Sequence, residues 1–269
     1  MPALTAMSWG PFDLTGRVGL LTGATGHLGG HMAGTLAAAG ASLVLTGRDP
    51  GRLAALAERY GADAVVALDV TDPGAVGDLL AKVEAAHGRL DFLVNNDSSG
   101  PQATLAQATA EHFQAQFRVG PTASFELTRR ALPLLRAAVG RSGGTAAVVN
   151  VASMYGLVSP DPGVYGDPGQ ASPPFYAAAK GALIQLTRYL ACHLGPESIR
   201  VNALSPGPFP RPAAAERDPA FFERLAAKVP LGRLGRADEL GAAVVFLAGE
   251  ASSFMTGANL VVDGGWTAW

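Results

Sequence analysis

The sequence predicts a single α/β domain built on a doubly wound, parallel, seven-stranded sheet with helices on both faces. Short apolar runs alternate along the chain with longer segments of helical periodicity. The apolar runs are nearly continuous rather than alternating, which is typical of strands covered by helices on both sides. No Pro-, Gly- and Ser-rich linker divides the 269 residues into two parts that would each fold.

The expected strands are short apolar runs bounded by turn residues: 18–22, 42–46, 64–68, 92–95, 146–151, 200–204 and 260–262. The expected helices lie between them at 28–39, 51–60, 73–87, 110–139, 175–194 and 237–248. Repeated strand–helix units imply parallel strands joined by right-handed crossovers. The segments 159–174 and 205–230 are rich in Pro, Gly, Asp and Ala, and loops of that length are usually functional.

Composition and charge argue against several classes of protein. The formal net charge is -2 and no basic run stands out, so we expect neither nucleic acid nor an anionic membrane as a partner. No apolar stretch reaches the roughly 20 residues that cross a bilayer. Residues 1–12 lack the features of a signal peptide and are expected to form a flexible extension of the domain at 13–269. The sequence therefore predicts a cytoplasmic protein that binds a small molecule.

The single cysteine, Cys192, excludes an internal disulfide framework. It lies within an apolar helical pattern, so we expect it in the core. No metal site is expected.

A glycine-rich turn follows the first expected strand and opens the first expected helix. It reads Thr22-Gly23-Ala24-Thr25-Gly26-His27-Leu28-Gly29-Gly30. Glycines let the backbone approach a diphosphate, and a helix N-terminus supplies free N–H groups and a positive dipole end. The turn predicts a Rossmann-type site for a nicotinamide dinucleotide, although a merely tight connection is the alternative. The cofactor-binding residues expected in it are Gly23, Thr25, Gly26, His27, Leu28 and Gly29.

The residues after the second strand favour NADP(H) over NAD(H). An acidic residue at this point would bind the ribose hydroxyls of NAD and repel a 2′-phosphate. Here Gly47 occupies that position and Arg48 follows it. Arginine matches a phosphate bidentately, although a solvated arginine at a helix start is the alternative interpretation.

Tyr176 and Lys180 are spaced i, i+4, which places a phenol and an ammonium on one face of the last long helix. A free tyrosine has a pKa near 10, and a neighbouring cation favours the phenolate. The pair is therefore a candidate for general acid–base chemistry.

Further motifs accompany the glycine turn and the Tyr176/Lys180 pair in a consistent order: Asp69-Val70, Leu93-Val94-Asn95-Asn96, Val149-Asn150-Val151-Ala152-Ser153, Val201-Asn202-Ala203-Leu204-Ser205-Pro206-Gly207 and Asp263-Gly264-Gly265. With them the chain resembles the short-chain dehydrogenase/reductase family along nearly its whole length. Its C-terminal segment and the 159–174 insertion resemble a subgroup labelled gluconate 5-dehydrogenase or 3-oxoacyl-carrier-protein reductase.

The resemblance implies a role for each matching position. Tyr176 would be the general acid in reduction or the base in oxidation, and Ser153 would hydrogen-bond the substrate oxygen. Lys180 would hold the nicotinamide ribose and lower the pKa of Tyr176. The remaining cofactor-binding positions would be Asp69 and Val70 at the adenine, Asn95 in a supporting strand, and Pro206 and Gly207 at the nicotinamide side.

Four features depart from the family pattern. His27 replaces the middle glycine of the turn, and Asp97 places a carboxylate beside the cofactor where the family has alanine. Gly120 stands where many members carry an asparagine of the proton relay, so either water fills the space or activity is lost. Ser153 and Tyr176 are 23 residues apart instead of about a dozen. The alternative partner Tyr165 has no lysine four residues later.

The segment 205–230 is expected to be a substrate lid, with Phe209, Arg211, Arg217, Phe221 and Phe222 available to close on a polar or acidic substrate. The first substrate choice is a polyol, sugar acid or related keto compound, and the second is a 3-oxoacyl thioester. A dinucleotide-binding protein without turnover is the alternative function. The resemblance also suggests a homotetramer or dimer built on the helices at 110–139 and 175–194, with the aromatic C-terminus at a subunit contact.

Overall fold

A seven-stranded parallel sheet forms the centre of the computed structural model, which describes residues 10–142, 144–165, 171–211 and 218–269. The strand order is β3-β2-β1-β4-β5-β6-β7. The strands are β1 (Val18–Leu21), β2 (Ser42–Gly47), β3 (Ala64–Ala67), β4 (Phe92–Asn95), β5 (Ala146–Val151), β6 (Ile199–Pro206) and β7 (Asn259–Val262). The predicted fold class is confirmed. The order reverses between β1 and β4, which opens a crevice at the carboxyl ends of the strands.

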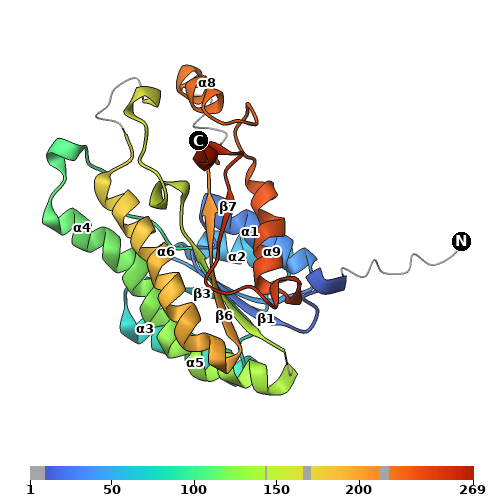
Figure 1. The fold of residues 1–269 in the computed structure, drawn as a ribbon. Coiled ribbons are helices and arrows are strands. Elements are labelled where there is room, and N and C mark those ends of the chain that lie inside the picture. Colours follow the sequence, from blue (N-terminus) through green and yellow to red (C-terminus); the bar gives the residue numbers. More distant parts are fainter. Residues whose placement is uncertain (1–9, 143, 166–170, 212–217) are drawn as a thin grey trace, which may run out of the picture.

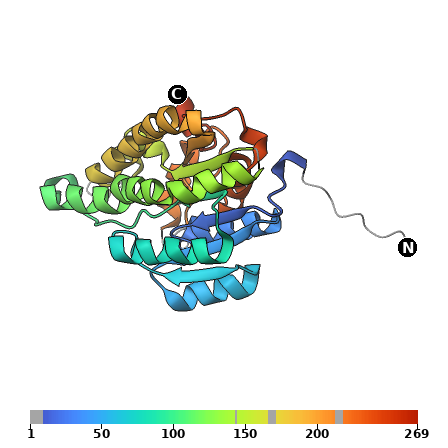
Figure 2. The same cartoon turned by 90° about the horizontal axis from the view of Figure 1, so that it is seen from below.

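Helices cover both faces of the sheet (Figures 1 and 2). On one face lie α1 (His27–Ala38), α2 (Pro50–Tyr60) and α9 (Gly241–Ala248), which share a buried apolar cluster with the strands. On the other face lie α3 (Pro73–His87), α5 (Ala123–Ser142) and α6 (Pro174–Leu194), which form a second such cluster. Burial on both faces explains why the strands read as continuous apolar runs.

Local sequence signals set several helix boundaries. Asp49 and Asp72 cap α2 and α3, and each is followed by a proline in the first turn. Each aspartate accepts a backbone N–H bond that the helix cannot satisfy itself, at 3.0 Å from Arg52 N and at 2.8 Å from Gly74 N. Among the described residues, no helix combines the length and apolar character needed to cross a bilayer.

The helix expected at 110–139 is interrupted. The structure divides it into α4 (Ala110–Phe117), a π-helical segment (Arg118–Thr122) and α5. Gly120 has φ -91° and ψ -107°, outside the helical region, and Pro121 has no N–H to donate to the preceding turn. Cys192 is also placed differently from the expectation, because it lies on the exposed side of α6 rather than in the core.

The two expected loops contain more regular structure than the sequence indicated. Ser205 and Pro206 end β6, and residues 219–227 form a further helix, α8 (Pro219–Ala227), whose N-cap is Asp218. In the first segment, Pro162–Val164 is a short 3₁₀ turn and Pro174 already belongs to α6. The described parts of both segments lie at or beyond the carboxyl ends of the strands (Figure 1), and Arg224 Nε of α8 donates to Val164 O at 2.9 Å. Asp167 and Arg217 lie outside the described residues.

Candidate active site

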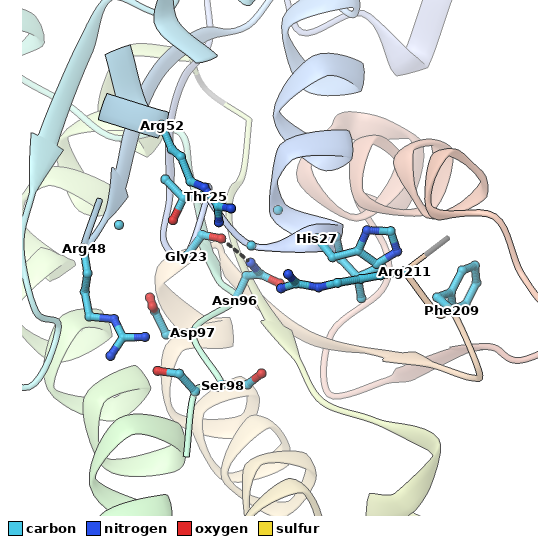
Figure 3. A pocket seen from close by; sticks show the side chains of 15 residues that line it. Gly23, Thr25, His27, Arg48, Arg52, Asn96, Asp97, Ser98, Phe209 and Arg211 are labelled. Carbon is cyan, nitrogen blue, oxygen red and sulfur yellow. Dashed lines mark hydrogen bonds between the residues drawn. The ribbon is translucent and has the colours of Figure 1, made fainter. Parts of the chain in front are cut away.

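A cavity of about 520 Å³ opens at the carboxyl ends of β1, β2 and β4 (Figure 3). Its lining contains every residue expected from the glycine turn, together with Arg48 and Asp97. The full set is Gly23, Thr25, Gly26, His27, Leu28, Gly29, Gly47, Arg48, Arg52, Asn96, Asp97, Ser98, Ser99, Phe209 and Arg211. The structure therefore brings these sequence-predicted residues together.

The turn is packed so closely that side chains would not fit. Gly23 adopts φ +60°, and a Cβ on Gly29 would lie 2.3 Å from the Gly23 carbonyl oxygen. Asn96 follows β4, the strand beside β1, and it holds the turn in place. Its Nδ2 donates to Thr22 O at 3.2 Å and to Gly23 O at 3.1 Å. Asn96 was not expected as a site residue. The bare backbone and the start of α1 suit an anionic diphosphate.

A positively charged region lies at the end of β2. A Cβ on Gly47 would lie 2.8 Å from Thr25 Oγ1, so the position leaves no room for the acidic side chain that selects NAD unless Thr25 moves. Arg48 lines this cavity and also an adjoining one of about 150 Å³, which it shares with Asp69, Val70 and Asp97. The expected adenine-side residues are thus neighbours.

Asp97 and His27 are only partly satisfied within the chain. Asp97 Oδ2 is buried without a hydrogen-bond partner among the described residues, and burial raises the pKa of this carboxyl group. His27 Nε2 is likewise buried and unpaired among the described residues. Burial, aided by His31, lowers the pKa of His27. Both unpaired atoms belong to residues that line the cavity. A polar ligand bound there would supply the hydrogen-bond partners that these atoms lack.

A second pocket of about 450 Å³ adjoins the first, and Phe209 lines both. Ser153 and Tyr176 line this second pocket, although 23 residues separate them in the chain. Ser153 is 7% exposed at the end of β5, and its hydroxyl accepts a hydrogen bond from Tyr155 N at 3.2 Å. Gly207 also lines the pocket, whereas Pro206 is the buried last residue of β6.

Lys180 lies in the protein interior beside this pair. It is 3% exposed, and its Nζ donates to Val151 O at 2.7 Å. The ammonium lies 5.7 Å from the centre of the Tyr176 ring. Burial lowers the pKa of Lys180 to about 8, while the charge of Asp97 acts in the opposite direction.

The net shift of the Tyr176 pKa in the structure is upward, whereas the resemblance implied a lowering by Lys180. Burial raises the pKa of the Tyr176 phenol, and the hydrogen bond with Ser153 opposes that shift. Desolvation of the phenolate therefore outweighs any attraction to the ammonium. The phenol is the stable form at neutral pH.

Behind the pocket, a chain of buried amides and hydroxyls joins β4, β5 and α6. Asn95 Nδ2 donates to Asn150 Oδ1 at 2.8 Å, and Asn150 Nδ2 donates to Thr187 Oγ1 at 2.9 Å. Asn95 is thus a structural residue that supports the strand, and neither of the two large cavities is lined by it. Gly120 faces α6, because a Cβ added to it would lie 4.0 Å from the Cβ of Ala179.

The insertion contributes to the outer wall of the second pocket. The hydroxyls of Tyr155 and Tyr165 lie 2.9 Å apart, and both residues line the pocket. Asp161 pairs with Lys228 at 2.7 Å, and the rings of Tyr165 and Phe221 lie 5.3 Å apart. The two segments that the sequence indicated as loops therefore contact each other. Tyr155 was not expected as a site residue, because no spacing in the sequence marks it.

Comparison with known proteins assigns the chain to a family. A family model described as Enoyl-(Acyl carrier protein) reductase matches residues 23–267. The chain is 34% identical over 256 residues to an uncharacterized short-chain type dehydrogenase/reductase, y4vI, of Sinorhizobium fredii; the match covers 93% of this chain and 44% of that protein. It is 32% identical over 259 residues to the rhamnolipids biosynthesis 3-oxoacyl-[acyl-carrier-protein] reductase of Pseudomonas aeruginosa, covering 94% and 97% of the two chains.

Solved structures agree with these relatives. A gluconate 5-dehydrogenase from Burkholderia cenocepacia, in complex with NADP and tartrate, is similar with a TM-score of 0.83 and 31% sequence identity. The match covers 96% of this chain and 98% of that one. The family model, the relatives and the shared fold all lead to one conclusion: the chain belongs to the short-chain dehydrogenase/reductase family, whose members bind a nicotinamide dinucleotide.

Proposed function

We propose that the protein is an NADP(H)-dependent oxidoreductase that interconverts a ketone and a secondary alcohol. The observation that carries this proposal is the position of Ser153 and Tyr176 in a pocket that adjoins the glycine-turn cavity, with Lys180 buried beside them. The nicotinamide ring, when bound, supplies or accepts the hydride. The residues of the chain then have to orient the substrate and move one proton.

Tyr176 is the proton donor in the direction of ketone reduction. A phenol is protonated at neutral pH, so a proton is available to the developing alkoxide. Burial raises the pKa of Tyr176 in the structure, which favours the same protonated form. The Ser153 hydroxyl, at the rim of the same pocket, hydrogen-bonds the same substrate oxygen and orients it. Lys180, when the cofactor is bound, would hold its ribose. In alcohol oxidation the roles of donor and acceptor are exchanged.

NADP(H) is the cofactor that the cavity fits best. Gly47 carries no acidic side chain at the end of β2, and Arg48 lines the cavity at this point. Asp69 and Asp97 line the adjoining cavity and interact with the Arg48 charge, which a 2′-phosphate would share with them. A 2′-phosphate matches a guanidinium group in charge and geometry. The related gluconate 5-dehydrogenase structure contains NADP, which supports the same choice.

A small polar ketone or alcohol is the proposed substrate: a polyol, sugar acid or related keto compound. Tyr155, Tyr165 and Gln102 line the pocket and offer polar groups for further substrate oxygens, although the two tyrosine hydroxyls also hydrogen-bond each other. A 3-oxoacyl thioester is the second candidate, supported by the 3-oxoacyl reductase relative. We also propose a homotetramer or dimer, with the helical segments at 110–139 and 175–194 at the contact; light scattering tests this.

The test is NADPH oxidation with a panel of polyol-derived ketones, keto acids and 3-oxoacyl thioesters. Tyr176→Phe should abolish turnover and leave NADP⁺ binding unchanged, because only the proton donor is lost. Tyr189→Phe, an exposed tyrosine on the same helix, is the matched control and should keep full activity. Binding of NADP⁺ without turnover across the panel would favour the alternative, a non-catalytic dinucleotide-binding protein, to which Gly120 and Asp97 point.

A further inference from the structure

Positive charge enters the glycine-turn cavity from two directions. Arg48 and Arg52 come from β2 and the start of α2, and Arg211 comes from the opposite side (Figure 3). Arg211 belongs to the segment after β6 that the sequence indicated as a substrate lid. The structure places its side chain in the glycine-turn cavity, and Arg211 does not line the pocket of Ser153 and Tyr176.

Hydrogen bonds hold the backbone at Gly207 and Pro208, a few residues before Arg211. Gly207 N donates to Val262 O at 2.9 Å, and Gly235 N donates to Pro208 O at 3.0 Å. Phe209 packs directly on the backbone of Gly235, where a Cβ would lie 2.3 Å from its ring. The starting point of the Arg211 side chain is therefore fixed beside the cavity, which reduces the ordering cost of a contact made there.

The opposite wall at this place is the N-terminus of α1. Its N-cap, Gly26, offers no side-chain hydrogen bond, so the first N–H groups of the helix are available to a ligand. His27, the first residue of the helix, is close enough to Arg211 for the guanidinium charge to lower the imidazole pKa. Burial is the largest cause of that lowering, and it disfavours a charge on His27. Arg211 is therefore the full positive charge that faces the helix start.

We propose that the guanidinium group of Arg211 binds the diphosphate of the dinucleotide, opposite the helix N-terminus. This inference rests on the proposed function, since it requires that a dinucleotide binds. A diphosphate carries two negative charges, and the partial charge of one helix end balances only about half of one. A guanidinium group on the other side supplies most of the remainder through charge-assisted hydrogen bonds.

Binding titrations with the whole protein test the assignment, using NADP⁺, NAD⁺ and 2′-AMP as probes. Arg211→Ala should weaken both NADP⁺ and NAD⁺ by roughly 10- to 100-fold, the usual range for a lost charge-assisted hydrogen bond. Binding of 2′-AMP should stay within about twofold, because that probe has no diphosphate. Arg211→Lys should fall between wild type and Arg211→Ala, because charge remains but the bidentate geometry is lost.

Two control variants separate this inference from the proposed function. Arg48→Ala should weaken NADP⁺ and 2′-AMP and leave NAD⁺ unchanged, and Arg236→Ala, whose side chain is 64% exposed, should change none of them. Unchanged NADP⁺ binding in Arg211→Ala would overturn the assignment while the proposed function stands. Equal losses for all three probes would also overturn it, since they would indicate a damaged fold. Failure of the wild-type protein to bind any dinucleotide would refute the proposed function itself.

Discussion

Lys180 should destabilise the folded protein at neutral pH, and a pH series can measure by how much. The ammonium is 3% exposed and its pKa falls from 10.5 to about 8 on burial. Between these two values the unfolded chain binds more protons at this site than the folded protein does. The free energy of unfolding therefore rises as the pH rises from about 8 to 10.5, and it changes little below pH 8.

Each unit of pKa shift corresponds to about 1.4 kcal/mol, so the lowered pKa of Lys180 reduces the free energy of unfolding at neutral pH by about 3 kcal/mol. Roughly 2 to 3 kcal/mol of this loss is recovered between pH 7 and 10. Urea denaturation at fixed protein concentration measures it as the difference between wild type and Lys180→Met, a variant that cannot titrate. Wild type should gain stability relative to the variant as the pH rises. The exposed Lys82, replaced by methionine, is the matched control and should give curves parallel to wild type. A pH-independent difference for Lys180→Met would refute the reasoning.

Three further substitutions test the site and its support. Gly29→Ala, whose Cβ would lie 2.3 Å from Gly23 O, should lower the free energy of unfolding by about 1–3 kcal/mol and weaken NADP⁺ binding. The control Gly77→Ala, with open space around it, should change neither quantity. A normal NADP⁺ affinity for Gly29→Ala in titrations would contradict the close packing. Gly47→Asp, which requires the Thr25 side chain to move, should raise the dissociation constant of NADP⁺ relative to that of NAD⁺ by repelling the 2′-phosphate, and an unchanged ratio would remove the basis for NADP(H). Asn150→Leu removes one hydrogen bond from each of two buried partners, Asn95 and Thr187, and should lower the free energy of unfolding by about 0.5–1.5 kcal/mol for each, measured by urea denaturation; an unchanged midpoint would argue against the buried amide chain.

The order of strands and helices is predictable because its signals are local. Apolar runs, helical periodicity and the aspartate–proline starts of α2 and α3 act over a few residues, and the structure has each strand close to its expected position. The break at Gly120 and Pro121 is different. Proline weakens a helix at that point, but the π-helical segment also depends on how α4, α5 and α6 pack around it.

The neighbouring Asn95 and Asn96 show what the sequence leaves open at a site. Successive residues of a strand point to opposite faces, and the strand ends between these two. Asn95 turns into the buried layer, whereas Asn96 reaches the glycine turn. Since both are asparagines, the sequence alone does not indicate which one faces the ligand. The register of β4 against β5 decides it.

The sequence by itself determined the sheet, the glycine turn and the Tyr176/Lys180 spacing, because each depends on residues that are neighbours in the chain. Tertiary structure decided which charges meet and how much water reaches them. It brought Arg211 to the glycine turn and Tyr165 to Tyr155. It also raised the pKa of Tyr176, where an isolated tyrosine–lysine pair would lower it. Desolvation depends on what packs around a group, and those neighbours come from distant parts of the chain.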